Sequence, residues 1–181
     1  MEISIIVWCL ILCAFFSGME IAFVSSNKIY LEIEKKQDNY ISRILSKLTE
    51  KPSKFIAAML IGNNIALVLY GFFMGDLVMI WIENLGFHFS AFWNVLLQTL
   101  LSAILILATA EFLSKVFFQI YANILIKVFA IPAYGFYLLF YYISSFIIWI
   151  SDIILIKFFK TQGDQVSLYF SKAELGDYIT E

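Results

Sequence analysis

Three long apolar stretches of this sequence contain polar side chains that hydrocarbon surroundings would disfavour. The first carries Ser17 and Glu20 in the segment FSGME, the second carries Asn63 and Asn64 in the segment IGNN, and the third carries Glu111. A charged group near the middle of a bilayer costs roughly 2.5–3.5 kcal/mol, so such residues usually face a partner or an ion pathway. We therefore predict that the three stretches meet and hold a cation.

The chemistry of these side chains favours a hard cation. Their donors are carboxylate, amide and hydroxyl oxygens, which suit Mg²⁺ or Na⁺ better than zinc or copper. Gly18 and Gly62 lie beside the ligands, where a glycine is expected to loosen the helix and free a backbone carbonyl as a further ligand.

Two simpler interpretations of the same residues remain open. Asparagine and serine in membrane helices often only form hydrogen bonds between helices, at about 0.6 kcal/mol each. Glu111 and Lys115 are four residues apart and could form a plain ion pair. Three separate polar interruptions at similar depth favour a shared functional site.

Composition places the chain in the membrane. Of its 181 residues 62% are hydrophobic and only 14% are charged, with a mean hydropathy of +0.87, whereas ordinary domains carry about 25% charged residues. We expect an all-α integral membrane protein whose transmembrane domain covers residues 1–160. Spans are predicted at about 3–24, 55–82 and 91–118, because about 20 apolar residues cross a bilayer.

The segments between and after the spans have other patterns. Residues 27–50 combine charges with apolar residues at helical spacing, which predicts amphipathic helices on the membrane surface. Ser53 is predicted to cap the second span. The aromatic stretch 121–159 is interrupted at 132–135 by Pro-Ala-Tyr-Gly, which predicts a bent membrane-embedded belt. Residues 161–181 are predicted to begin a cytoplasmic helical bundle, with a capping box at 171–174.

The positions of basic residues predict the orientation. Seven of the twelve lie between residues 27 and 54, and none lies before Ser17 or in 83–90. The positive-inside rule then places the N-terminus outside and the C-terminus in the cytoplasm of a multi-pass cell-membrane (inner or plasma membrane) protein. At 1.5 Å per residue, Ser17 lies about 21 Å and Asn63 about 18 Å from the outer boundary. Glu20 and Glu111 are expected to lie deeper.

The sequence gives little support for thiol chemistry, a histidine metal site or enzymatic catalysis. Cys9 and Cys13 are interpreted as small apolar residues of a membrane helix, and His88 has no metal-binding neighbours in the sequence. Because no nucleophile–base pair is visible, we do not expect an enzyme, and no nucleic-acid partner is expected.

The polar segments also carry a family likeness. The sequence has FSGMEIA at 16–22, Pro52 to Phe55 followed by IGNN at 61–64, and AEFLSK at 110–115. It thereby resembles the transmembrane domain of the CorC/CNNM magnesium transporters, whose pattern is FSG-x-E-x-A, P-x-x-F, IGNN and G-E-x-x-P-K. The likeness covers essentially the whole chain.

The resemblance implies a homodimer with three transmembrane helices per subunit, surrounded by membrane lipids and a belt of juxtamembrane helices. It implies Mg²⁺ efflux driven by Na⁺ entry, and regulation by ATP–Mg²⁺ through a cytoplasmic CBS-pair region that this chain lacks. It assigns metal contacts to residues of all three motifs: Ser17, Asn63, Asn64 and Glu111, supported by Glu20, Gly18 and Gly62.

The chain departs from the family pattern at three positions. Ala110 replaces glycine, Ser114 replaces the proline that kinks the third helix, and Met19 replaces a common second serine. Transport competence or ion choice could differ as a result. The alternative function is a non-transporting membrane scaffold of the same fold that serves a secretion or motility assembly.

Overall fold

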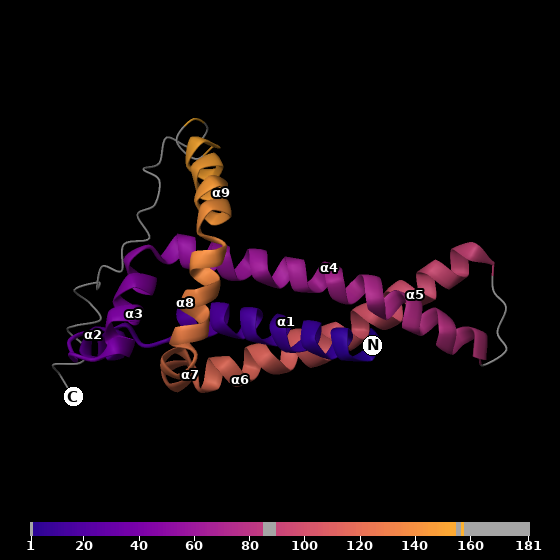
Figure 1. Ribbon diagram of the computed structural model, residues 1–181, viewed down its shortest axis with the longest axis horizontal. Coiled ribbons are helices and arrows are strands. Elements are labelled where there is room, and N and C mark those ends of the chain that lie inside the picture. Colours follow the sequence, from indigo (N-terminus) through magenta and orange to yellow (C-terminus); the bar gives the residue numbers. More distant parts are fainter. Residues whose placement is uncertain (1, 85–89, 155–156, 158–181) are drawn as a thin grey trace.

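The chain folds into helices of very different lengths. The computed structural model describes residues 2–84, 90–154 and 157, and every regular element within them is helical (Figure 1). In chain order the elements are α1 (Glu2–Ser25), α2 (Lys28–Lys35), α3 (Tyr40–Glu50), α4 (Pro52–Asn84), α5 (Ala91–Ile106), the π-helical η1 (Leu107–Leu113), α6 (Ser114–Ile120), α7 (Ala122–Val128), α8 (Ala130–Leu139) and α9 (Tyr141–Ile154). The predicted cytoplasmic bundle at 161–181, the capping box within it and residues 85–89 lie outside the described residues.

The three predicted spans are confirmed. Helices long and apolar enough to cross a membrane cover Ile3–Ser25, Pro52–Asn84 and Ala91–Ile120, the last formed by α5, η1 and α6 together. The second span begins at Pro52, so the prediction that Ser53 caps it is wrong. Proline is favoured in the first helical turn, since it lacks an N–H that would find no partner there, and the Lys51 carbonyl accepts from the Phe55 N–H.

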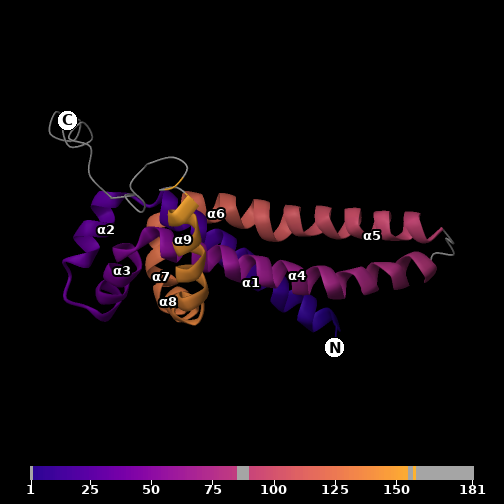
Figure 2. The same ribbon diagram turned by 90° about the horizontal axis from the view of Figure 1, so that it is seen from above.

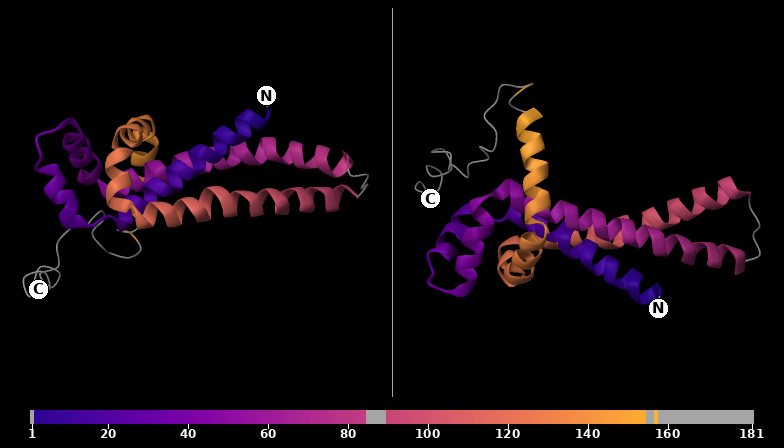
Figure 3. Two further views of the ribbon diagram at one scale, coloured as in Figure 1. Left: turned by 90° about the horizontal axis from the view of Figure 1, so that it is seen from below. Right: turned by 45° about the horizontal axis from the view of Figure 1, so that its top comes forward.

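The spans pack side by side, with the short helices gathered at one end (Figure 1). We call this end, with α2, α3, α7 and α8, the proximal end, and the end with Glu2, Asn84 and Ser90 the distal end. In Figures 2 and 3 the spans separate toward the distal end. The third span reaches the proximal end again, where Phe118 packs against Gly18.

The amphipathic segment forms two helices, each begun by an asparagine. The Asn27 side chain accepts hydrogen bonds from the N–H groups of Ile29 and Tyr30, and the Asn39 side chain accepts one from the Ser42 N–H. These caps satisfy N–H groups that have no partner within the helix. Leu45 and Leu48 of α3 turn into the protein and are fully buried.

The aromatic stretch forms α7, α8 and α9, and none of these helices, as far as the described residues extend, is long enough to span a membrane alone. The axes of α7 and α8 differ by 65°, and the 14 residues of α9 extend only about 21 Å, against roughly 30 Å for a hydrocarbon core. The predicted break at 132–135 is wrong, because α8 continues through these residues and the breaks fall at Phe129 and Phe140. Pro132 lies in the first turn of α8, where its missing N–H does no harm.

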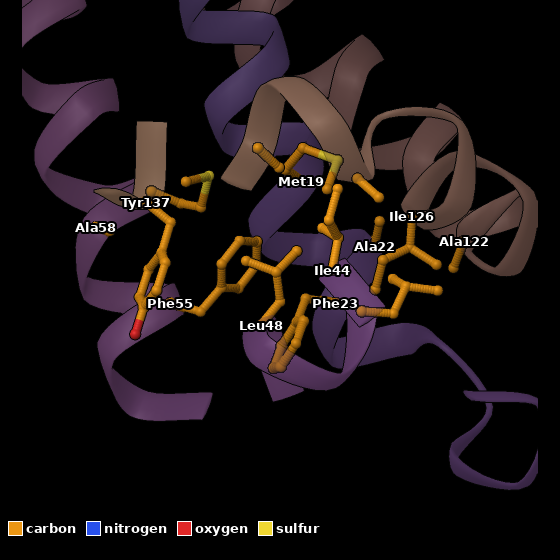
Figure 4. Packing of buried hydrophobic residues seen from close by; sticks show 14 of the residues in the cluster. Met19, Ala22, Phe23, Ile44, Leu48, Phe55, Ala58, Ala122, Ile126 and Tyr137 are labelled. Atoms are coloured by element: carbon orange, nitrogen blue, oxygen red, sulfur yellow. The ribbon is translucent and has the colours of Figure 1, made fainter. Parts of the chain in front are cut away.

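A hydrophobic core at the proximal end joins spans, surface helices and belt. Met19 of α1, Leu48 of α3, Phe55 of α4 and Tyr137 of α8 converge there (Figure 4). The Phe55 ring lies 4.7 Å from that of Phe23 and 6.4 Å from that of Tyr137, measured between centroids. Burial of these rings gives the proximal end a hydrophobic core packed from side chains of several helices.

Polar contacts reinforce the attachment of the surface helix α3 and of the span α4 to the belt. Lys47 Nζ donates to Tyr134 Oη at 3.2 Å and lies 5.3 Å from that ring. Lys54 Nζ donates to Ser145 Oγ at 3.0 Å, over the ring of Tyr141. A cation over an aromatic face adds to each hydrogen bond.

An ion pair links α2 to α7. Lys127 contacts the carboxylate of Glu34, whose side chain is only 5% exposed, and Asn123 accepts from the Asn27 N–H at 2.9 Å. Hydrogen bonding by Glu34 raises the pKa of Lys127 above its ordinary value, so the lysine keeps its charge at physiological pH.

Replacing Glu34 by glutamine should loosen α2 from the belt, because the charge on Lys127 loses its partner. Hydrogen–deuterium exchange of α2 should accelerate several-fold, whereas Glu32→Gln, which affects a partly exposed pair with Lys35 within α2 itself, should leave it unchanged. In the unaltered protein the stabilisation that the Glu34–Lys127 pair contributes is complete below pH 10.5, the ordinary lysine value. It is lost as pH rises through the raised pKa of Lys127. Equal exchange in both variants would contradict the role assigned to the pair.

Candidate intramembrane cation site

Ser17 lies at the centre of the helix packing. It is fully buried on α1, and its hydroxyl donates to the Ala110 carbonyl at 3.2 Å. The same Oγ lies 2.9 Å from Ser114 Oγ, which is itself 2.5 Å from the Ala110 carbonyl. The first and third predicted motifs therefore meet through three oxygens inside the membrane segment.

The third span changes its helical form at this contact. Residues 107–113, which include Ala110 and Glu111, form the π-helical segment η1. Such segments are rare and often occur at functional sites, because they alter the backbone hydrogen-bonding pattern. The proline of the family pattern is absent here, yet an irregular segment still occupies this region, and Ser114 hydrogen-bonds to its backbone.

The two asparagines of the second motif have different surroundings. Asn63 is buried, and its Oδ1 is among the buried side-chain atoms of the described residues that lack a hydrogen-bond partner. Asn64 lies on the exposed face of α4, where its Nδ2 donates to the Leu60 carbonyl at 2.9 Å. Asn63 thus keeps an unpartnered acceptor oxygen inside the protein, whereas Asn64 faces outward.

The two glycines serve packing. A Cβ at Gly62 would lie 2.6 Å from the ring of Phe16, and one at Gly18 would lie 2.5 Å from the ring of Phe118. Helices α1 and α4 continue unbroken through both positions, so the expectation that these glycines loosen the helix is wrong. Their missing side chains instead make room for aromatic rings.

Those rings are in turn held by the belt. The ring of Phe16 packs edge-on against that of Phe136 at 4.8 Å, and the ring of Phe118 stacks on that of Phe129 at 5.7 Å. The belt therefore braces both helices that contribute Ser17 and Ser114.

The carboxylates of Glu20 and Glu111 are close enough to influence each other electrostatically. Glu20 is half-buried and lies within electrostatic range of Glu111 and Lys115. In the part of the chain that the structure describes, no ion pair joins Glu111 to Lys115, so the plain-pair interpretation has no support. Negative charge near neutral oxygens would favour a cation.

The polar atoms of the candidate site are oxygens, the donor type that hard cations prefer. Among the described residues no group of three or more histidine, cysteine, aspartate or glutamate side chains could hold a metal. Ser17, Asn63 and the Ala110 carbonyl supply neutral oxygens instead, and the partnerless Asn63 Oδ1 fits an oxygen-seeking ion that keeps some of its water.

Two sets of residues were missed by motif reasoning. Ser114, noted only as a departure, contacts Ser17 directly. Asn94, Gln98 and Ser102 form a row on α5 that no motif contains. Their spacing of four residues in an apolar span could have signalled a polar helix face.

Fold and site together define a class: a multi-pass helical membrane protein with a polar site between its spans. The family model for the cyclin M transmembrane N-terminal domain matches residues 4–181, and the chain belongs to this family. It is also similar to a UPF0053 protein of Haemophilus influenzae, with 39% identity over 61 residues. That match covers 34% of this chain and 14% of the relative.

Replacing Gly62 by alanine should lower thermal stability in detergent, because the new methyl group meets the Phe16 ring and overpacking costs about 1–3 kcal/mol. Gly71 lies on the same helix, and a Cβ added there would meet nothing within 4 Å, so Gly71→Ala is a matched control. It should be neutral or stabilising by up to about 1 kcal/mol. Equal melting temperatures for the two variants would contradict the packing role assigned to Gly62.

Proposed function

We propose that this protein transports Mg²⁺ through a site centred on Ser17 and Asn63. The observation that carries the proposal is the convergence of the Ser17 hydroxyl on the Ala110 carbonyl and Ser114, in a bundle where Asn63 keeps an unpartnered oxygen. Membership of the cyclin M family supports it.

The residues have separate roles in this proposal. Ser17 and Asn63 exchange protein or water hydrogen bonds for contacts with the ion. Glu20 and Glu111 supply negative charge without closing a tight cage, because Mg²⁺ releases its waters reluctantly and is bound best by a few protein oxygens. Asn64 is assigned a lesser part, since it faces outward and hydrogen-bonds within its own helix.

The proposed transport is efflux coupled to Na⁺ entry, with no catalytic step. The N-terminus and the distal end then face outward, and the proximal end faces the cytoplasm, as the positive-inside rule predicts. The active form is a homodimer in a lipid bilayer, and a cytoplasmic CBS-pair region would confer control by ATP–Mg²⁺. The resemblance of the three motifs supports these assignments.

Ser17→Ala and Asn63→Ala should each weaken Mg²⁺ binding about tenfold or more, as loss of a partner commonly does at metal sites. Isothermal titration calorimetry of the purified protein measures this directly. Ser26→Ala is the matched control: Ser26 is also buried, but its hydroxyl donates to the nearby Phe23 carbonyl at 3.0 Å. Unchanged binding in both site variants would refute the site.

Flux separates a transporter from a scaffold. Proteoliposomes that carry a Mg²⁺ gradient and a fluorescent indicator should show Mg²⁺ movement that an opposing Na⁺ gradient accelerates, and Asn63→Ala should abolish it. Absence of flux from protein that still binds Mg²⁺, with a copurifying partner, would favour the scaffold function.

A further inference from the structure

A row of polar side chains runs along α5 in the distal half of the bundle. Asn94, Gln98 and Ser102 recur every four residues and therefore lie on one helix face. Most of α5 is exposed, and Ser102 is one of two buried residues in it, the other being Ile106. The row is thus the face that α5 turns toward the rest of the protein.

This face borders a cavity of about 240 Å³ between α4 and α5. The α5 wall includes Gln98, Thr99 and Ser102, and the α4 wall includes Gly71 and Gly75. A Cβ at Gly75 would collide with the Gln98 carboxamide, and one at Gly71 would meet nothing within 4 Å. The missing side chain of Gly75 therefore makes room for the Gln98 carboxamide, and that of Gly71 leaves open space in the cavity.

The side-chain oxygens of Asn94 and Ser102 form no hydrogen bonds between helices. Asn94 Oδ1 and Ser102 Oγ are buried and have no hydrogen-bond partner, and Ser102 is only 7% exposed. Polar residues that merely join membrane helices form hydrogen bonds across the interface. An unsatisfied polar group in an apolar medium costs free energy, so the hydroxyl of Ser102, which lines the cavity, needs water or an ion there as a partner.

Tyr70 links the cavity to the buried cluster near Ser17. It lines the cavity, is 2% exposed, and donates to the Ser102 carbonyl at 3.2 Å. It also belongs to the buried cluster that contains Cys13 and Ala110, and the Ala110 carbonyl is the partner of Ser17. The tyrosine therefore lines the cavity and shares a buried cluster with the residue whose carbonyl is the partner of Ser17.

We propose that the distal cavity is a water-filled subsite for a hydrated metal cation. This inference rests on the proposed transport function. No carboxylate is among the described residues that line the cavity, so neutral oxygens hold the ion through its water. Binding of this kind is weak enough for release, which conduction requires.

Cysteine labelling tests for water in the cavity. In a Cys9→Ala/Cys13→Ala background, Gln98→Cys and Leu100→Cys are treated with a membrane-impermeant methanethiosulfonate in membrane fragments whose two faces are open. Leu100 lies on the same helix and is 54% exposed outside the cavity, so it is the lipid-facing control. Gln98→Cys should react roughly tenfold faster or more, because the thiolate is the reactive form and water stabilises it. Equal rates would overturn the proposal.

Cation protection tests for the ion. Mg²⁺ or Na⁺ should slow labelling of Gln98→Cys relative to choline at equal ionic strength, and the ion that protects identifies the occupant. Rapid labelling that neither ion slows would mean a wet cavity without a cation site, which overturns the assignment. The measurement is repeated with Asn63→Ala: protection that persists there supports the distal subsite even if Mg²⁺ binding at Ser17 fails.

Discussion

A serine hydroxyl buried in the middle of a membrane helix must find polar partners within the protein, because lipid offers none. Ser17 finds them on the third span, at the Ala110 carbonyl and Ser114. This contact brings α1 against the π-helical segment and aligns the two spans. The position of Glu111 beside α1, within electrostatic range of Glu20, follows from it.

Close approach of these helices depends on glycine and on the belt. Gly18 and Gly62 leave space into which Phe118 and Phe16 fit, and belt residues Phe129 and Phe136 hold those rings in place. The short helices at the proximal end therefore do more than lie at the membrane surface. Any movement of α7 or α8 would move rings that contact the backbone on either side of the polar site.

The two ends of the bundle differ in how they are packed. The proximal end has a continuous aromatic and aliphatic core, with an ion pair and two lysine–tyrosine contacts at its edge. The distal end splays open, and the side-chain oxygens of Asn94 and Ser102 there have no hydrogen-bond partner. Tyr70 of α4 contacts α5 in this loosely packed half through its hydrogen bond to the Ser102 carbonyl.

Sequence alone determined the class of the protein and the location of its polar groups along each helix. Apolar runs of sufficient length predicted the three spans, and helix rise placed Ser17 and Asn63 at similar depth, because both depend on local composition and on a constant 1.5 Å per residue. Tertiary structure decided which groups meet. Asn63 and Asn64 are adjacent and chemically identical, yet only the rotation of α4 against α1 buries one and exposes the other. The glycines looked like helix breakers, but aromatic rings from distant segments give them their role. Rotation and interhelical packing arise from contacts across the whole bundle, and no local pattern encodes them.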